Sequence, residues 1–322
     1  MKRILLAAIV ATGACSDSSG PAAQAPRTRF VTVAPGVRLE VVDYGGSGEP
    51  LVLLAGSGNT AHVFATFAWR FTDTYHVVAL TRRGFGASSK PATGYDTRTL
   101  AEDVRIVLDS LRLTRVSLMG HSLAGDEMTR LAGDHPDRVR KLIYLDAAYD
   151  RVALGAIMAE YPLPTPPAPT SGELATKEGF GRYIQRVRGV PIPADEIAAT
   201  FSFATDGSLI GELTPPEIYR KLLGSEEAPD YARVRVPSLG IYAVAQDAGD
   251  VVPWLTPASE DWPIAQEVFH GVFEPFYGGE RARFQTQVTQ NQVLEMPAAN
   301  HYVFLSDAAR VAGAVRSFLQ KP

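Results

Sequence analysis

The chain has 322 residues, of which 46% are hydrophobic and 20% are charged, and its formal net charge is −4 at pH 7. These proportions exclude a globally disordered chain. The mild acidic excess also gives no indication of the basic surface that binds nucleic acid. No apolar stretch reaches the roughly 18 residues that a membrane-spanning helix requires. The length fits one large α/β domain that carries an insertion.

The N-terminus has the pattern of an export signal. Residues 1–3, Met-Lys-Arg, form a positive region, residues 4–11 are apolar, and small residues then precede Cys15, the only cysteine. This predicts a signal peptide over residues 1–14. The position of Cys15 resembles the lipobox of bacterial lipoproteins, although Thr12 stands where Leu is usual. We expect export, either with a lipid on Cys15 that holds the protein to a bacterial membrane facing the periplasm or exterior, or as a secreted protein.

The next segment, residues 15–29, has the Ser, Gly, Pro and Ala content of a flexible tether. Beyond it, apolar runs alternate with amphipathic ones. Strands are predicted at residues 30–33, 37–44, 51–55, 76–80, 116–119, 142–145, 238–244 and 292–296, and helices at 61–74, 97–112, 123–134 and 306–320. This alternation is typical of a mostly parallel sheet with helices on both faces, and the first two strands form an antiparallel hairpin at one edge.

The alternation stops after residue 150. Residues 151–232 are rich in Pro and polar residues, with helical spacing near 174–188 and 215–223. We interpret this segment as an inserted helical cap, which leaves residues 30–150 and 233–322 as the core. We expect about a third of the aromatic residues in or next to this segment to line a hydrophobic pocket. These residues are Tyr149, Tyr161, Phe180, Tyr183, Phe201, Phe203 and Tyr219.

One serine lies where a predicted strand turns into a predicted helix. The sequence Gly-His-Ser-Leu-Ala-Gly occupies residues 120–125. A serine in such a sharp turn between small residues is typical of a nucleophile elbow. Gly120 supplies one small residue, but Ala124 stands where a second glycine is expected. The pattern predicts Ser122 as a nucleophile.

A serine nucleophile needs a base, and the chain has six histidines. His301 directly follows the last predicted strand, so its loop opens at the same edge of the sheet as the turn at Ser122. His121 adjoins the serine, but neighbouring side chains in an elbow point apart. His135 lies at a helix end and is expected to be exposed. We therefore predict His301 as the base.

Four segments together resemble the α/β-hydrolase superfamily, in its serine esterase and lactonase branch. They are residues 54–58, 82–88, 120–125 and 300–301, and the resemblance covers about residues 30–320. It implies an α/β-hydrolase fold with an eight-stranded, mostly parallel sheet and a helical cap.

The same resemblance implies an oxyanion hole formed by the backbone N–H groups of Ser57 and Leu123. Ala55 replaces the usual His of that loop. Thr81 replaces the Asp that usually precedes the segment at 82–88, which we interpret as scaffold.

The third triad member has two candidates. Most members of the superfamily place the acid after the seventh strand, where this chain has Asp247 and, as a third choice, Asp250. A minority, including haloalkane dehalogenases and zearalenone-type lactonases, place it after the sixth strand, about 24 residues beyond the nucleophile. Asp146 lies 24 positions after Ser122. We favour Asp146 and keep Asp247 as the alternative acid.

The resemblance implies a serine hydrolase that cleaves a carboxylic ester or lactone of a small to mid-sized hydrophobic substrate through an acyl-enzyme. We expect no cofactor, no metal and no nucleic acid partner. Contact with a membrane is expected only through the lipid at Cys15. A C–C bond hydrolase or a perhydrolase with the same triad is an alternative, as is a non-catalytic surface binding protein. Haloalkane dehalogenases and epoxide hydrolases are set aside, because they use Asp as the nucleophile.

Overall fold

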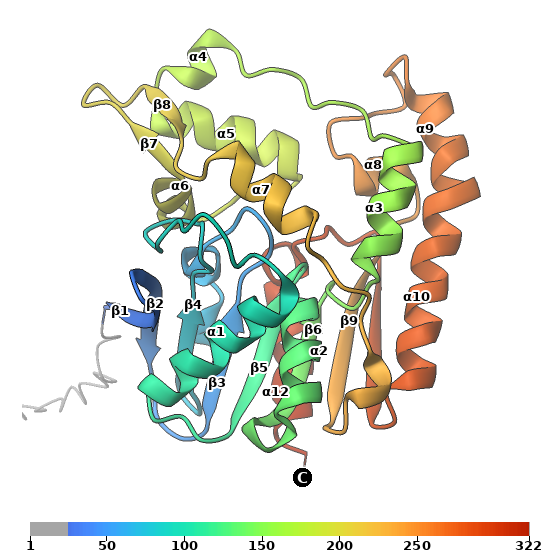
Figure 1. Ribbon diagram of the computed structural model, residues 1–322. Coiled ribbons are helices and arrows are strands. Elements are labelled where there is room, and N and C mark those ends of the chain that lie inside the picture. The colour runs from blue at the N-terminus through green and yellow to red at the C-terminus, as the bar shows by residue number, and fades with distance from the viewer. Residues whose placement is uncertain (1–24, 322) are drawn as a thin grey trace, which may run out of the picture.

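An eight-stranded sheet runs through the centre of the protein, and helices cover both of its faces (Figure 1). The computed structural model describes residues 25–321. The predicted signal peptide and Cys15 lie outside the described residues. Within them, no helix combines the length and the apolar character needed to cross a membrane.

The strand order is β1-β2-β4-β3-β5-β6-β9-β10. Only β2 runs against the direction of the others, because it pairs antiparallel with both β1 and β4. The eight-stranded, mostly parallel sheet predicted from the sequence is therefore confirmed. The strands are β1 Arg27–Ala34, β2 Val37–Gly45, β3 Pro50–Leu54, β4 His76–Leu80, β5 Val116–His121, β6 Val139–Leu145, β9 Ser238–Val244 and β10 Asn291–Pro297.

The strand order reverses at β3. From β3 the chain passes to β4 on one side, and it returns to place β5 on the other. The loops after β3 and β5 therefore leave the carboxyl edge of the sheet side by side, at the kind of switch point where open α/β sheets bind ligands.

Side chains of the central strands alternate between two buried layers. Val52 and Leu54 of β3 pack in one layer with α1 (Thr97–Ser110) and α2 (Ala124–Asp134). Leu51 and Leu53 pack in the other with α12 (Ala308–Leu319). Burial on both faces explains why these strands read as continuous apolar runs.

The helix predicted at residues 61–74 is wrong. The chain instead forms two 3₁₀ turns, Ala61–Phe64 and Ala68–Arg70. Ala61, Phe64 and Phe67 recur every three residues, which is the period of a 3₁₀ helix. All three are fully buried, so the packing of these side chains selects the tighter turn.

A group of short elements lies above the carboxyl edge of the sheet in Figure 1. These elements are α3 Arg151–Glu160, α4 Ser171–Leu174, α5 Lys177–Arg188, α6 Ala194–Thr200, β7 Phe201–Phe203, β8 Leu209–Glu212 and α7 Pro216–Leu223. The β7–β8 hairpin and the helices α3 and α6 were not predicted from the sequence. The division into a core and a cap at residues 151–232 stays a prediction.

The segment between β9 and β10 is also helical, and no helix was predicted there. It contains α8 Ala248–Val251, α9 Trp262–Val268, a π-helix at Phe269–Phe273 and α10 Glu274–Gln287. The hydrophobic period is weak in α10, where only Glu280 and Phe284 are buried. After β10, the short helix α11 Val303–Ser306 leads into α12.

Candidate active site

Ser122 lies in a strained turn between β5 and α2. Its φ of 53° falls in the left-handed region that non-glycine residues seldom adopt. A Cβ on Gly125 would lie 1.9 Å from the Ala147 carbonyl oxygen, and a Cβ on Gly120 would lie 2.9 Å from the Ala124 methyl group. Glycine is thus required at 120 and 125, whereas position 124 accepts alanine. The departure noted in the sequence at Ala124 is harmless, because the close approach falls one residue later.

The loop after β3 lies against this turn. A Cβ on Gly56 would lie 3.0 Å from the Ser122 Cβ. Among residues 25–321, neither the Ser57 N–H nor the Leu123 N–H donates to a backbone acceptor, whereas the Ser122 N–H donates to the Leu145 carbonyl at 3.2 Å. Two unengaged N–H groups beside a serine are the donors that an oxyanion would need.

Arg82 holds the loop after β3 in place. Its Nη2 donates to the Ala55 carbonyl oxygen at 2.8 Å and its Nη1 to that of Gly56 at 3.2 Å. Its Nε pairs with Glu127 of α2, and both side chains are buried. Burial raises the pKa of Glu127 despite the opposing effect of Arg82. One ion pair therefore joins the loop after β3 to the helix that follows Ser122, a link that the sequence reading missed.

His301 forms its side-chain contact with Asp146. Nδ1 lies 2.7 Å from Asp146 Oδ2. The other carboxylate oxygen accepts from the Tyr149 hydroxyl at 2.5 Å and from the Ala243 N–H at 3.0 Å. Burial raises the pKa of Tyr149 well above its ordinary value, so the phenol stays a donor. The carboxylate fixes Nδ1–H of the ring and leaves Nε2 free to act as a base.

Asp247, the alternative acid, forms hydrogen bonds to other residues. Its Oδ1 accepts from the N–H groups of Gly249 at 2.8 Å and Asp250 at 3.2 Å, which caps the start of α8. Asp250 in turn accepts from the Gln246 N–H at 2.7 Å. Within the described chain, neither carboxylate bonds to His301. The geometry therefore favours Asp146 as the partner of the histidine.

His121 supports the loop that carries His301. Its Nε2 lies 3.2 Å from the His301 carbonyl oxygen, and its ring packs 4.7 Å from that of Tyr302. Burial holds the pKa of His121 well below its ordinary value, so the ring is neutral. In the described chain His301 makes its hydrogen bonds to Asp146 and His121, and none to Ser122 Oγ. The serine–base contact often tightens only in the substrate complex.

A cavity of about 220 Å³ opens beside the loop after β3, where helices α5, α6 and α7 meet the core. Its lining includes Gly58, Asn59, Arg188, Glu196, Tyr219 and Tyr302. Of the aromatic residues predicted to line a pocket, Phe201 and Tyr219 contribute to this cavity. Phe180 instead packs against Phe201 at 4.7 Å between ring centroids.

Glu196 joins α6 to the residues that follow the proposed oxyanion loop. It accepts hydrogen bonds from Asn59 Nδ2 at 3.0 Å, from the Thr60 N–H at 2.9 Å and from the Thr60 hydroxyl. Burial raises the pKa of Glu196 to about 7, although the hydrogen bonds from Thr60 and Asn59 oppose that rise. Asn59 is further held by the Tyr302 hydroxyl, which donates to its Oδ1 at 3.1 Å.

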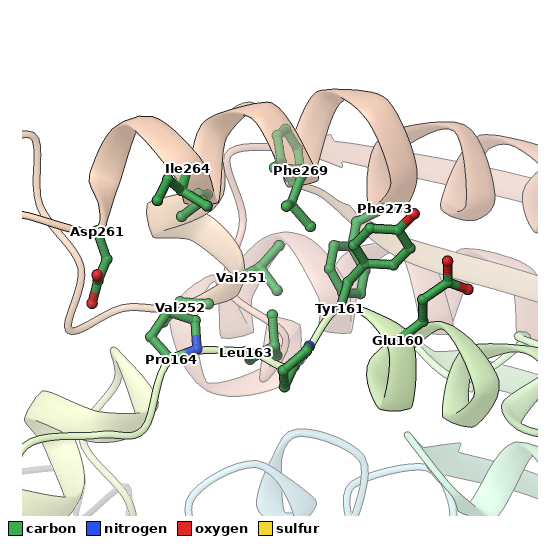
Figure 2. Close-up of a pocket in the computed structure, with 14 residues that line it drawn as sticks. Glu160, Tyr161, Leu163, Pro164, Val251, Val252, Asp261, Ile264, Phe269 and Phe273 are labelled. Carbon is green, nitrogen blue, oxygen red and sulfur yellow. The ribbon is translucent and has the colours of Figure 1, made fainter.

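A larger apolar hollow of about 380 Å³ lies between the end of α3 and helices α8 and α9. Figure 2 shows Ile264 and Phe269 on one side of it and Leu163 and Pro164 on the other. Neither this hollow nor the smaller cavity has Ser122, His301 or Asp146 in its lining. Among residues 25–321, no cluster of three or more His, Cys, Asp or Glu side chains could hold a metal ion.

Comparison with known proteins agrees with this geometry. Residues 49–188 match the family model described as the alpha/beta hydrolase fold. The structure of E-2-(acetamidomethylene)succinate hydrolase is similar with a TM-score of 0.69 and 21% identity, over 92% of this chain and 100% of that one. The chain therefore has the α/β-hydrolase fold.

Individual relatives match mostly in part. A fluoroacetate dehalogenase from Burkholderia sp. is 39% identical over 107 residues, which are 32% of this chain and 35% of the relative. The chain spans well under two thirds of the first curated relatives, 35% to 41% of their length. A protein from Synechocystis sp. described as a non-heme chloroperoxidase matches more widely, with 26% identity over 85% of this chain and 92% of the relative.

Proposed function

We propose that this protein is a serine hydrolase that cleaves a carboxylic ester or lactone through an acyl-enzyme. The observation that carries the proposal is that Ser122, at φ 53°, donates its N–H to the carbonyl oxygen of Leu145, and the next residue, Asp146, bonds to His301. Among the described residues, the N–H groups of Ser57 and Leu123 donate to no backbone acceptor. This combination supplies a nucleophile, a base with its orienting acid, and donors for an oxyanion.

The proposed reaction has two halves. Ser122 Oγ attacks the substrate carbonyl carbon and gives its proton to His301 Nε2, while the N–H groups of Ser57 and Leu123 hold the oxyanion. His301 then protonates the leaving alcohol, which departs and leaves an ester on Ser122. Water attacks that ester, His301 takes one of its protons, and the acid product leaves as the serine recovers its hydrogen. Asp146 keeps the imidazole oriented and stabilises its charged form throughout.

Replacement of Ser122 tests the proposal. Ser122→Ala should abolish hydrolysis of p-nitrophenyl butyrate and labelling by a fluorophosphonate probe, because both need the hydroxyl as nucleophile. A loss of about 10⁴-fold or more is expected for a triad serine. Thermal unfolding should be little changed, since the side chain is partly exposed. An alanine variant that keeps more than a few per cent of the activity would rule out Ser122 as the nucleophile.

A perhydrolase reaction is the second candidate, favoured by the match to the chloroperoxidase-like protein over most of the chain. Peroxide would then replace water in the second half of the reaction. Bromination of monochlorodimedone in the presence of acetate, peroxide and bromide, lost in Ser122→Ala, would support it. The C–C bond hydrolase alternative uses the same residues and would be detected by including a vinylogous diketone among the substrates.

We also propose that the chain is exported and carries a lipid on Cys15. The support comes from the sequence of residues 1–15 alone. Incorporation of labelled palmitate during expression in a bacterial host, abolished by Cys15→Ala, tests the lipid. Release of an unlabelled protein from the cells would favour the secreted alternative.

A further inference from the structure

The cavity beside the loop after β3 contains several polar side chains, and nearly all of their donors are already used. Asn59 Nδ2 donates to Glu196 at 3.0 Å, and the Thr200 hydroxyl donates to the same carboxylate at 3.3 Å. The Tyr302 hydroxyl donates to Asn59 Oδ1 at 3.1 Å, and the Tyr219 hydroxyl donates to Glu212. A ligand in this cavity therefore finds few donors among these groups.

Arg188 is the exception. It is the last residue of α5 and lines the cavity. Its guanidinium forms no salt bridge with any described residue, whereas Arg186, two positions earlier, pairs with Glu173 at 2.9 Å. A guanidinium carries five N–H donors in a planar fork, which matches the two oxygens of a carboxylate.

The backbone places this guanidinium beside the loop after β3. A Cβ on Gly58 would lie 3.9 Å from Arg188 Nη2. Gly58 is two residues from Gly56, which touches Ser122, and two Cα steps span at most about 7.6 Å. The Arg188 carbonyl oxygen accepts from Asn300 Nδ2 at 2.8 Å, so the end of α5 is bonded to the residue beside His301.

We propose that Arg188 binds a carboxylate of the substrate, so that the preferred substrates are esters or lactones that carry one free carboxylate a short spacer away from the reacting carbonyl. The inference rests on the proposed function and narrows its substrate class. The apolar residues Ile184, Ile192, Ile197 and Phe201 of the same cavity would surround the spacer. The expected substrate is thus still largely hydrophobic, with one charged end.

The charges around the cavity oppose a doubly charged ligand. Glu196 and Glu212 also line it, and each accepts hydrogen bonds from the protein. Their presence opposes a dianion such as a phosphate monoester, because like charges at short range repel. A carboxylate brings one charge and two coplanar acceptors, which Arg188 alone can satisfy.

A matched pair of chromogenic esters tests the proposal on the full chain. The p-nitrophenyl hemisuccinate and hemiglutarate are compared with p-nitrophenyl butyrate and valerate, which have a similar length and no charge. We expect kcat/KM of the wild type to be about 10- to 100-fold higher for the charged esters, in line with a charge-assisted hydrogen bond. Arg188→Gln should remove that preference, because it should lower kcat/KM of the charged esters far more than that of the neutral esters.

Arg186→Gln is the control, because Arg186 lies in the same helix as Arg188 but does not line the cavity. It should keep the full preference. Arg188→Lys should keep part of it, because the charge stays and the fork is lost. If Arg188→Gln folds poorly, the binding of a single carboxylate can be measured on the wild type. Valerate should then protect the serine from fluorophosphonate labelling better than valeramide does.

A wild type that cleaves charged and neutral esters equally well would overturn the role of Arg188 and leave the serine hydrolase intact. So would a preference that survives in Arg188→Gln. If neither ester is cleaved and the fluorophosphonate does not label Ser122, the proposed function itself fails, and the carboxylate site fails with it.

Discussion

The carboxyl edge of the sheet and the helices above it hold their functional side chains in different ways. At the sheet edge the backbone does the positioning: Ser122 and Asp146 both adopt left-handed angles, φ 53° and 48°, directly after buried parallel strands. Above the sheet, hydrogen bonds of single side chains join the helices to the core. Glu196 of α6 bonds to Asn59 and Thr60, and Asn300 bonds to the Arg188 carbonyl at the end of α5.

Under the proposed function, residues at the sheet edge would carry out the reaction, and side chains from the helices above it would recognise the substrate. Residues at the ends of β5 and β6 are fixed by strands that are buried on both faces, so they shift little when the surface changes. The contacts made from α5 and α6 depend on a few side chains at the surface of the core. We therefore expect substitutions at the sheet edge to remove the reaction, and substitutions above it to alter which substrate is taken.

The largest expected effect is a loss of kcat on substitution of the triad acid, and it distinguishes Asp146 from Asp247. Asp146→Asn should lower kcat by about 10³- to 10⁴-fold, because an amide no longer holds the histidine in the required tautomer. Asp247→Asn should lower it less than about threefold, since Asp247 caps α8. Steady-state hydrolysis of one ester by both variants measures the ratio. A larger loss in Asp247→Asn would reverse the assignment of the acid.

The next effect concerns the ion pair between Arg82 and Glu127. Glu127→Gln leaves a buried guanidinium without its counter-charge, which typically costs about 3–5 kcal/mol of the free energy of unfolding. Urea denaturation measures it. Glu102→Gln is the control, because Glu102 pairs with Arg105 on an exposed face of α1, where such pairs contribute about 1 kcal/mol or less. Equal losses in the two variants would mean that burial does not matter at Glu127.

The smallest expected effect is a dependence of the free energy of unfolding on pH, caused by Glu196. Its pKa is raised from 4.5 to about 7 in the fold, so between these values the folded chain retains a proton that the unfolded chain has released. The contribution of Glu196 to stability is therefore present below pH 4.5 and is lost as the pH rises to about 7. The free energy of unfolding of the wild type, relative to Glu196→Gln, should fall between pH 5 and pH 8.

Urea unfolding of both proteins at four pH values across that range measures this change. Glu212→Gln, which alters an exposed glutamate on the same cavity, is the matched control. A difference between wild type and Glu196→Gln that stays constant with pH would show that this carboxylate is ionised in the folded chain throughout the range.

Local sequence was enough for the features that depend on neighbouring residues. The alternation of apolar strands and amphipathic helices predicts the sheet, and a serine between small residues at a strand end predicts the turn at Ser122. The position of His301 follows from the same logic, because every parallel strand delivers its next loop to one edge of the sheet. These signals lie within a few residues of the feature that they predict.

Tertiary structure alone decided the contacts between distant segments. Asp146 and Asp247 both follow strands, and the sequence does not say that one carboxylate meets His301 while the other caps α8, because this depends on where the ends of β6 and β9 lie relative to the last loop. Arg82 and Glu127 are 45 positions apart, and Asn59 and Glu196 are 137 apart. Such pairs leave no periodic pattern, since hydrogen bonds and charges act across space and not along the chain.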